Sequence, residues 1–294
     1  ADILREDIAK YFNISTHEIV VGAGSDELIR IITSTFIEKG EKILCPTPSF
    51  GMYSIFTRVA GGTPVEIPLK ENFDYDMNAF YKAIDQHHPK LIFICSPNNP
   101  TGNTLGSSEL LDLVANFNGI VVIDEAYGEF CGESFIHDII KHPNGIVLKT
   151  FSKALGLAGL RIGYAVGNKD LVDQIYKVKS PYNINSFSQR AAELVLENMD
   201  IIEKRISAIV EERERLYREF SKIKKVQAYP SKANFILIRV ADADRVRRGL
   251  MEQGILVRSF ANDAGLKDCL RITVGTKEDN DILLQALEHV LGGQ

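Results

Sequence analysis

Short apolar runs alternate with amphipathic helical patterns through the first two thirds of the chain. The strand-like runs are Glu18–Val21, Lys42–Cys45, Leu91–Cys95, Ile120–Ile123, Gly145–Leu148 and Arg161–Val166. Helical patterns separate them, for example over Glu27–Glu38 and Ser108–Phe117. Several runs are apolar at every position, which is typical of strands covered by helices on both faces of a sheet. The pattern predicts an α/β fold in which crossover units build a mainly parallel sheet.

The last third of the chain has a different organisation. A long amphipathic stretch covers about residues 186–223, and its segment Glu211–Arg215 carries opposite charges at helical spacing, as a solvated helix face does. Further strand-like and helical patterns follow at Phe235–Ile238, Ala243–Gln253, Ile255–Val257, Leu270–Val274 and Asp279–Leu291. We therefore expect a large domain at residues 1–188 and a smaller α+β domain at residues 189–294, joined by a long helix over about residues 186–223.

Composition and charge narrow the class of function. The chain has 294 residues, of which 45% are hydrophobic and 25% charged, and its formal net charge is −5. Because no excess of positive charge is available to neutralise a phosphate backbone, we expect no nucleic-acid partner. No apolar stretch approaches the roughly 20 residues of a membrane helix, and the N-terminus does not have the pattern of a signal peptide. We expect a cytoplasmic protein with no membrane partner.

The cysteine and histidine patterns argue against a metal site. Cys45, Cys95, Cys131 and Cys269 are far apart and form no C-x-x-C pair, and no H-x-x-x-H pair occurs. We expect no bound metal, and we interpret the cysteines as reduced core thiols.

Polar segments follow four of the predicted strands. In open α/β sheets, ligands bind beyond the carboxyl ends of the strands, so these segments are candidates for a single site. They are Gly22-Ala23-Gly24-Ser25-Asp26-Glu27, Ser96-Pro97-Asn98-Asn99-Pro100-Thr101-Gly102, Asp124-Glu125-Ala126-Tyr127 and Lys149-Thr150-Phe151-Ser152-Lys153.

Each segment suggests a particular chemistry. The helix start at Ser25 suits one phosphate group, whereas Glu27 stands where a dinucleotide-binding loop needs its third glycine. Lys153 follows hydroxyl residues and precedes an apolar, glycine-containing segment that ends in Arg161, and poor solvation makes a lysine amine nucleophilic. Asp124 ends an apolar strand, where a carboxylate needs a cation or a donor; taken alone, it is equally compatible with a helix cap.

Together these groups form the set that pyridoxal 5′-phosphate requires. Lys153 would bond covalently to the cofactor, and Asp124 would pair with the pyridine nitrogen, which makes the ring an electron sink. Contacts to the phenolic oxygen and to the phosphate would come from Asn99, Tyr127, Ser25, Asp26, Ser152 and Arg161.

The chain resembles the fold-type I pyridoxal-phosphate aminotransferases and, among them, the histidinol-phosphate aminotransferase family. The resemblance is carried in order by the first three of the four segments above and by Thr150–Ala154, Ala158–Gly163 and Cys269–Thr276, and it extends over essentially the whole chain. It implies that Lys153 also moves the proton between the substrate and the cofactor. It implies further that Phe50 stacks on the ring, that Thr150 joins the phosphate ligands, and that the Asn99–Pro100 bond is cis.

For the substrates, the resemblance implies that Arg258 and Arg271 bind the substrate phosphate and the carboxylate of the co-substrate. The implied reaction transfers an amino group from L-histidinol phosphate to 2-oxoglutarate in a homodimer. In the family, an N-terminal segment with an Asn-Glu-Asn-Pro motif and a tyrosine that reaches the neighbouring subunit adds to the site, and this sequence does not contain it.

Other functions stay open at this point. Threonine-phosphate decarboxylases share much of the pattern, and aromatic amino-acid transamination is a further alternative. A non-catalytic pyridoxal-phosphate-binding module is less favoured, because regulators of that kind normally carry a fused DNA-binding domain that neither the charge nor the pattern supplies here.

Overall fold

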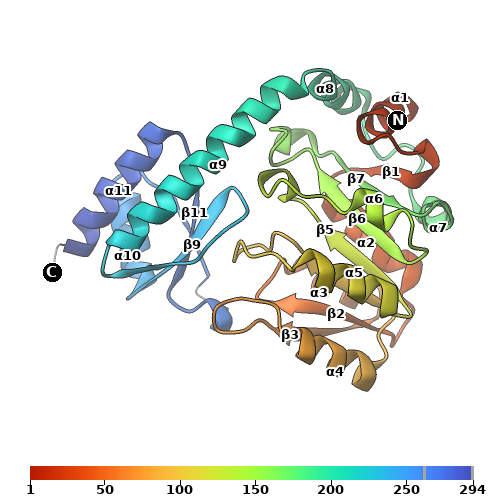
Figure 1. Cartoon of the computed structure of the whole chain (residues 1–294), viewed down its shortest axis with the longest axis horizontal. Coiled ribbons are helices and arrows are strands. Elements are labelled where there is room, and N and C mark those ends of the chain that lie inside the picture. Colours follow the sequence, from red (N-terminus) through yellow and green to blue (C-terminus); the bar gives the residue numbers. More distant parts are fainter. Residues whose placement is uncertain (261–262, 293–294) are drawn as a thin grey trace.

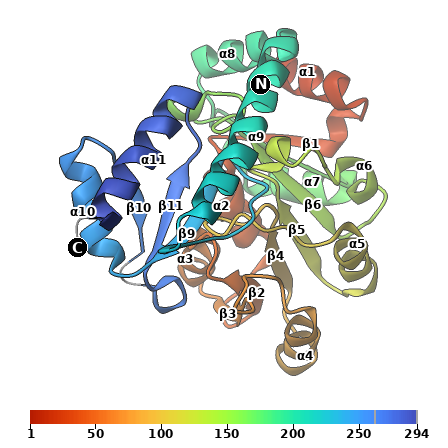
Figure 2. The same cartoon turned by 60° about the vertical axis from the view of Figure 1, so that its left-hand side comes forward.

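The computed structural model describes residues 1–260 and 263–292. Within these residues the strands form two sheets, which Figures 1 and 2 show as separate units with helices packed around each. One sheet has seven strands in the order β1-β7-β6-β5-β4-β2-β3, and the other has four in the order β10-β11-β9-β8. The α/β fold with a mainly parallel large sheet, expected from the sequence pattern, is confirmed.

The first unit comprises the larger sheet and most of the helices. Its strands are β1 (Ile19–Gly22), β2 (Lys42–Thr47), β3 (Thr63–Pro68), β4 (Leu91–Cys95), β5 (Ile120–Asp124), β6 (Gly145–Thr150) and β7 (Gly163–Gly167). Its helices are α1 (Asp2–Phe12), α2 (Ser25–Phe36), α3 (Met52–Val59), α4 (Met77–His87), α5 (Ser107–Asn116), α6 (Ile136–Ile139), α7 (Lys169–Val178) and α8 (Ser186–Glu197). Short 3₁₀ helices are η1 (Thr16–Glu18), η2 (Gly128–Phe130) and η3 (Ala158–Leu160).

Strand direction decides which loops meet. β3, β2, β4, β5 and β6 run parallel, whereas β7 runs antiparallel to both of its neighbours, β6 and β1. The carboxyl ends of β1, β4, β5 and β6 therefore lie at the same edge of the sheet as the beginning of β7. The segments that follow those four strands, and the segment that precedes β7, converge at this edge.

Side-chain alternation along the strands produces two apolar layers, as a sheet covered on both faces requires. On one face Val121 and Val147 pack in the layer that contains α1, α4, α5 and α6. On the other face Val122 and Leu148 pack against α2, α3 and α7. Asp124 lies two residues beyond Val122, so alternation directs its side chain toward α2 and α3.

The second unit is antiparallel throughout. It contains α9 (Met199–Lys222), β8 (Val226–Ala228), β9 (Phe235–Val240), α10 (Ala243–Glu252), β10 (Arg258–Ser259), η4 (Ala264–Leu266), β11 (Cys269–Thr273) and α11 (Lys277–Gly292). One face of its sheet packs on α9, α10 and α11 through residues such as Ile236 and Leu270. The opposite face, with Phe235 and Arg271, contacts the first unit. Figure 1 shows α9 leading from α8 to this unit.

The structure differs from the sequence prediction in a few elements. The single helix expected over residues 186–223 is two helices, because Asn198 has a non-helical backbone and its side chain closes α8 by donating to the carbonyl of Leu194. Ile255–Val257 is not a strand; β10 begins after it. β3 and β8 were not predicted, and β3 contains two prolines that obscure a strand pattern. Among the described residues, no helix is both long enough and apolar enough to cross a bilayer.

Candidate active site

A cavity of about 160 Å³ lies at the edge where the strand ends converge. All ten residues that the sequence predicted for the cofactor line it: Ser25, Asp26, Phe50, Asn99, Asp124, Tyr127, Thr150, Ser152, Lys153 and Arg161. Cys95 and Ala126 complete its wall. Residues from six segments between Ser25 and Arg161 thus share one small space.

The beginning of α2 forms one end of the cavity. Gly24 precedes the helix with a φ of 84°, and a Cβ atom there would lie 2.7 Å from the Nη2 atom of Arg161. A glycine is therefore required both by the left-handed backbone and by the close approach of the guanidinium. The free N–H groups of the first helical turn, at Ser25 and Asp26, provide donors that suit an anion.

Arg161 joins this helix end to the loop after β6. Its Nη2 atom donates to the Oδ2 atom of Asp26 at 2.9 Å, and its Nη1 atom lies 3.4 Å from the hydroxyl of Ser152. The backbone N–H of Ser152 in turn donates to the hydroxyl of Thr150 at 3.1 Å. A guanidinium, two hydroxyls and a helix N-terminus together form a cage that fits a phosphate group.

Asp124 lines the cavity with 2% of its surface exposed. Its two oxygens accept hydrogen bonds from the Tyr53 hydroxyl, at 2.7 Å, and from the Ala126 N–H, at 3.0 Å. Burial raises the pKa of the carboxyl group to about 6, although both donors act in the opposite direction. In the described part of the chain no lysine, arginine or histidine forms an ion pair with Asp124. The carboxylate therefore offers an unneutralised negative charge to the cavity.

Lys153 lines the same cavity as this carboxylate. Its Nζ atom is 5.4 Å from the centre of the Tyr127 ring. Partial burial and the positive charge of Arg271 lower the pKa of the Lys153 amine. Burial raises the pKa of the Tyr127 phenol to about 12, so this hydroxyl stays protonated and can donate a hydrogen bond. The lysine is thus biased toward its neutral, nucleophilic form beside a phenol donor.

Arg271 reaches the site from the second unit. One of its Nη atoms donates to the Oδ1 atom of Asn99, and its guanidinium stacks on Phe235, 4.9 Å from the ring centre. Its Nε atom is buried without a partner among the described residues. Burial, together with the nearby charge of Arg258, lowers the pKa of this guanidinium. The Asn99–Pro100 bond beside it is cis, as the family resemblance implies.

Arg258 is directly opposite Arg271 in the β10–β11 pair. Side chains of directly opposed residues project from the same face of a sheet, where like charges are destabilising unless an anion neutralises them. Arg258 itself is exposed. Neither arginine lines the 160 Å³ cavity. Arg271 nevertheless contacts Asn99, which is one of the ten residues that do line it.

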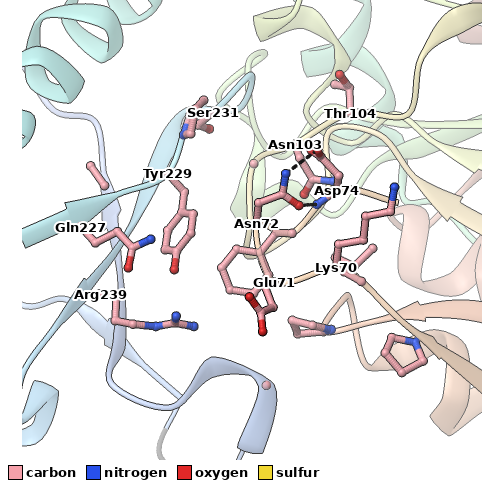
Figure 3. Close-up of a pocket in the computed structure, with 18 of the residues that line it drawn as sticks. Lys70, Glu71, Asn72, Asp74, Asn103, Thr104, Gln227, Tyr229, Ser231 and Arg239 are labelled. Atoms are coloured by element: carbon pink, nitrogen blue, oxygen red, sulfur yellow. Dashed lines mark hydrogen bonds between the residues drawn. The ribbon is translucent and has the colours of Figure 1, made fainter. Parts of the chain in front are cut away.

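A larger cavity, of about 1380 Å³, lies between the two units (Figure 3). Lys70 and Glu71 lie on its first-unit side, and Tyr229 and Arg239 face them from the second unit. None of the predicted site residues lines this space, and its charges are of both signs. The larger cavity is therefore not the one in which the residues predicted from the sequence, including Lys153, come together.

Sequence reasoning missed two residues of the site. Tyr53 donates a hydrogen bond to Asp124, and no local signal in the sequence distinguishes it from a core tyrosine. Cys95, interpreted as a core thiol, is buried but also lines the cavity. All four cysteines are free, and Cys131 is only half-buried rather than in the core. In the described residues no group of three or more potential metal ligands occurs.

Taken together, the fold and the site define an α/β enzyme in which a lysine, a buried carboxylate and a cage of anion-binding donors meet at one sheet edge. Comparison with known proteins gives the family: residues 1–287 match the family Aminotransferase class I and II. The chain belongs to this family.

Individual relatives agree with this assignment. The chain is 47% identical to the histidinol-phosphate aminotransferase of Thermoanaerobacter sp. (strain X514) over 291 aligned residues. The aligned region covers 99% of this chain and 83% of that protein. The crystal structure of the histidinol-phosphate aminotransferase from Clostridium acetobutylicum superposes with a TM-score of 0.91 at 29% identity, covering 99% of this chain and 89% of that one. The L-threonine-O-3-phosphate decarboxylase from Porphyromonas gingivalis gives a TM-score of 0.86 at 26% identity, covering 99% and 89%.

Proposed function

We propose that this protein is a pyridoxal-phosphate-dependent aminotransferase that converts L-histidinol phosphate and 2-oxoglutarate into imidazole acetol phosphate and glutamate, a step of histidine biosynthesis. The observation that carries the proposal is the meeting of Lys153, Asp124 and Arg161 in one cavity of about 160 Å³. The reaction follows from the names of the relatives, which match this chain over nearly its whole length.

The residues present fit pyridoxal phosphate. The buried Asp124 carboxylate lacks a cationic partner among the described residues, and a protonated pyridine nitrogen would supply one. At the other end, Ser25, Ser152 and Arg161 form an anion cage at a helix N-terminus. When bound, the cofactor supplies an electron sink for the electrons of a broken Cα–H bond.

The protein's own groups would carry out the remaining tasks. Lys153, whose pKa is lowered, would hold the cofactor covalently through its amine and would serve as the base that moves the proton between substrate Cα and the cofactor's C4′. Tyr127 and Asn99 would donate hydrogen bonds to the cofactor's phenolic oxygen. Phe50, which lines the same cavity, would pack on the ring.

Substrate binding is assigned to the arginines. Arg271 and Arg258 project from one face of the β10–β11 pair, so one anion can interact with two guanidinium groups. We assign to them the phosphate of histidinol phosphate in one half-reaction and a carboxylate of 2-oxoglutarate in the other. Alternation of these two anions at one site is compatible with a reaction in which the substrates bind in turn.

The proposal includes a homodimer located in the cytoplasm. It is supported by exposed apolar side chains around the beginning of α8: Tyr182 is 95% exposed and Phe187 is 73% exposed. Exposed aromatic residues of this kind favour a protein interface. Sedimentation equilibrium of the wild type and of a Tyr182→Ser/Phe187→Ser variant tests this part; a monomeric wild type would contradict it.

The reaction is tested by a single-turnover absorbance scan of cofactor-loaded protein mixed with L-histidinol phosphate. We expect the band of the lysine-bound cofactor to convert to that of pyridoxamine phosphate, and 2-oxoglutarate to reverse the conversion. Lys153→Ala should lose both the original band and turnover. A band that persists unchanged in this variant refutes the role of Lys153, and a wild-type band that ignores histidinol phosphate refutes the substrate.

The similarity to a threonine-phosphate decarboxylase structure makes that reaction the second candidate. The same scan with L-threonine O-phosphate, combined with a measurement of released CO₂, separates the two. Release of CO₂ from threonine phosphate, with no conversion by histidinol phosphate, would favour the decarboxylase.

A further inference from the structure

Tyr53 is fixed beside Asp124 by packing on several sides. It is 1% exposed, and its ring stacks on Phe93 of β4 with a centroid distance of 4.6 Å and an interplanar angle of 12°. Phe50, which lines the cavity, meets the Tyr53 ring edge-on at 5.7 Å. The hydroxyl is therefore held in one position, where it donates to the carboxylate of Asp124 at 2.7 Å and also lies beside the Cys95 thiol.

This hydrogen bond has an unusual importance for the carboxylate. A buried charge requires a cation or several donors, and among the described residues Asp124 has two donors, Tyr53 and the Ala126 N–H. The other nearby ionisable groups do not replace them. The groups around Asp124 are Asp26 of α2, Cys95 of β4, Glu125, Tyr75, Tyr127 and Lys153. Asp26 and Glu125 carry like charges, which favour protonation of Asp124.

Tyr53 itself remains a donor under all ordinary conditions. Burial, followed by the charge of Asp124, raises the pKa of its phenol well above 10. Removing its hydroxyl withdraws a hydrogen bond that stabilises only the ionised carboxylate, so the pKa of Asp124 must rise.

We infer that Tyr53 is a positioning residue whose hydroxyl keeps Asp124 ionised and oriented toward the pyridine nitrogen of the cofactor. The inference rests on the proposed function, in which Asp124 pairs with that nitrogen. It assigns to α3 a part in holding the cofactor: Phe50, just before the helix, packs on the ring, while Tyr53 governs the charge that meets its nitrogen.

The test measures the dissociation constant of pyridoxal phosphate from the full chain between pH 5 and pH 9, by the absorbance of the bound cofactor. In the wild type, binding should weaken as Asp124 becomes protonated. In Tyr53→Phe the midpoint should move upward by about one pH unit, since a hydrogen bond to a charged group contributes about 1.5 kcal/mol. Halfway between the two midpoints the variant should bind the cofactor about threefold more weakly, and below both midpoints the difference should approach about tenfold; at high pH the two proteins should converge.

Tyr75 provides a matched control. It is also a buried tyrosine, but its hydroxyl donates to the backbone carbonyl of Cys95 at 2.6 Å rather than to Asp124. Tyr75→Phe therefore loses a buried hydrogen bond in the same region, and its midpoint should equal that of the wild type. Melting temperatures of both variants measure the structural part of each change.

Asp124→Asn separates the inference from the function on which it rests. We expect this variant to lack the midpoint and to be unaffected by the further change Tyr53→Phe. If Asp124→Asn removes the midpoint while Tyr53→Phe leaves it at the wild-type pH, the role of Tyr53 is wrong and the proposed function stands. If Asp124→Asn itself binds the cofactor with the wild-type pH dependence, the pairing of Asp124 with the cofactor is wrong, and the inference is overturned with it.

Discussion

Lys149 is buried on the side of β6 opposite to Thr150, and its charge is balanced by two carboxylates. Its Nζ atom lies 3.2 Å from the Oε2 atom of Glu125 and 3.0 Å from the Oε1 atom of Glu129. Its side chain is 4% exposed, and those of the glutamates are 1% and 14% exposed. Although burial lowers the pKa of the lysine, Glu129 and Glu125 raise it well above 10.5, so the amine is charged. Replacing it by methionine keeps much of the volume and leaves two glutamates without their cation.

The size of the effect follows from these distances. At an effective dielectric constant of about 20, each contact corresponds to about 5 kcal/mol of Coulomb attraction, and the loss of solvation on burial offsets much of it. Glu125 keeps two donors, the Ser134 hydroxyl and the Phe135 N–H, both at 2.7 Å. We therefore expect Lys149→Met to lower the free energy of unfolding by about 3–5 kcal/mol, the range for breaking a buried ion pair from one side.

Urea unfolding followed by circular dichroism at pH 7 measures this change; the chain has no tryptophan, so tryptophan fluorescence does not serve. The two units need not unfold in one transition, so the free energy of unfolding is taken from the transition of the larger unit, which contains Lys149. Lys141→Met, which removes an exposed ion pair with Asp138, is the control and should leave the midpoint unchanged. Adding Glu125→Gln and Glu129→Gln to Lys149→Met should restore stability. An unchanged midpoint for Lys149→Met would refute the reasoning.

Three further predictions concern other parts of the site. Gly102→Ala should lower the melting temperature far more than Gly132→Ala. Both glycines have positive φ values, but only at Gly102 would a Cβ atom collide with the side chain of Ser231. Equal decreases in melting temperature would remove the steric argument. Arg271→Lys should raise KM for 2-oxoglutarate about tenfold through the loss of one charge-assisted hydrogen bond, and an unchanged KM would exclude this arginine from anion binding. Burial raises the pKa of the Asp124 carboxyl group from 3.8 to about 6. The folded protein therefore binds a proton at Asp124 more tightly than the unfolded chain does, and the free energy of unfolding falls as the pH rises from about 4 to about 6. In Asp124→Asn this decrease should be absent, so that its free energy of unfolding, measured with urea, should gain up to about 3 kcal/mol relative to the cofactor-free wild type between about pH 4 and about pH 6. If the two proteins show the same dependence of stability on pH, Asp124 is not the group responsible.

The sequence predicted most of the larger sheet and the cofactor side of the site, for a physical reason. Buried parallel strands are short apolar runs that stand out from their neighbours, and the residues that follow them must lie at one edge. Lys153, Asp124 and Ser25 each follow such a run within a few residues. Knowing the order of the strands was not necessary to place these side chains together.

What could not be predicted depends on contacts between distant segments. Tyr53 acquires its role only because α3 packs on β4 near the end of β5, and nothing local distinguishes it from a core tyrosine. The bond from Arg271 to Asn99 depends on how the two units are placed, which no motif encodes. Asn198 interrupts the amphipathic stretch without disturbing its apolar spacing, so the break between α8 and α9 was invisible to periodicity.

The antiparallel placement of β7 between β6 and β1 has a consequence for how the protein acquires its site. Arg161 precedes β7 and bonds to Asp26, 135 residues earlier in the chain. Within the described residues β1 pairs only with β7, so the strand that leads to this helix end joins the sheet only after β7 has been made. Such distant pairing is slow in folding, because a long loop must close before the contact stabilises anything. A nascent chain that ends before β7 would therefore carry the reactive lysine but not a complete anion cage, and capture of the cofactor would report that the whole sheet has formed.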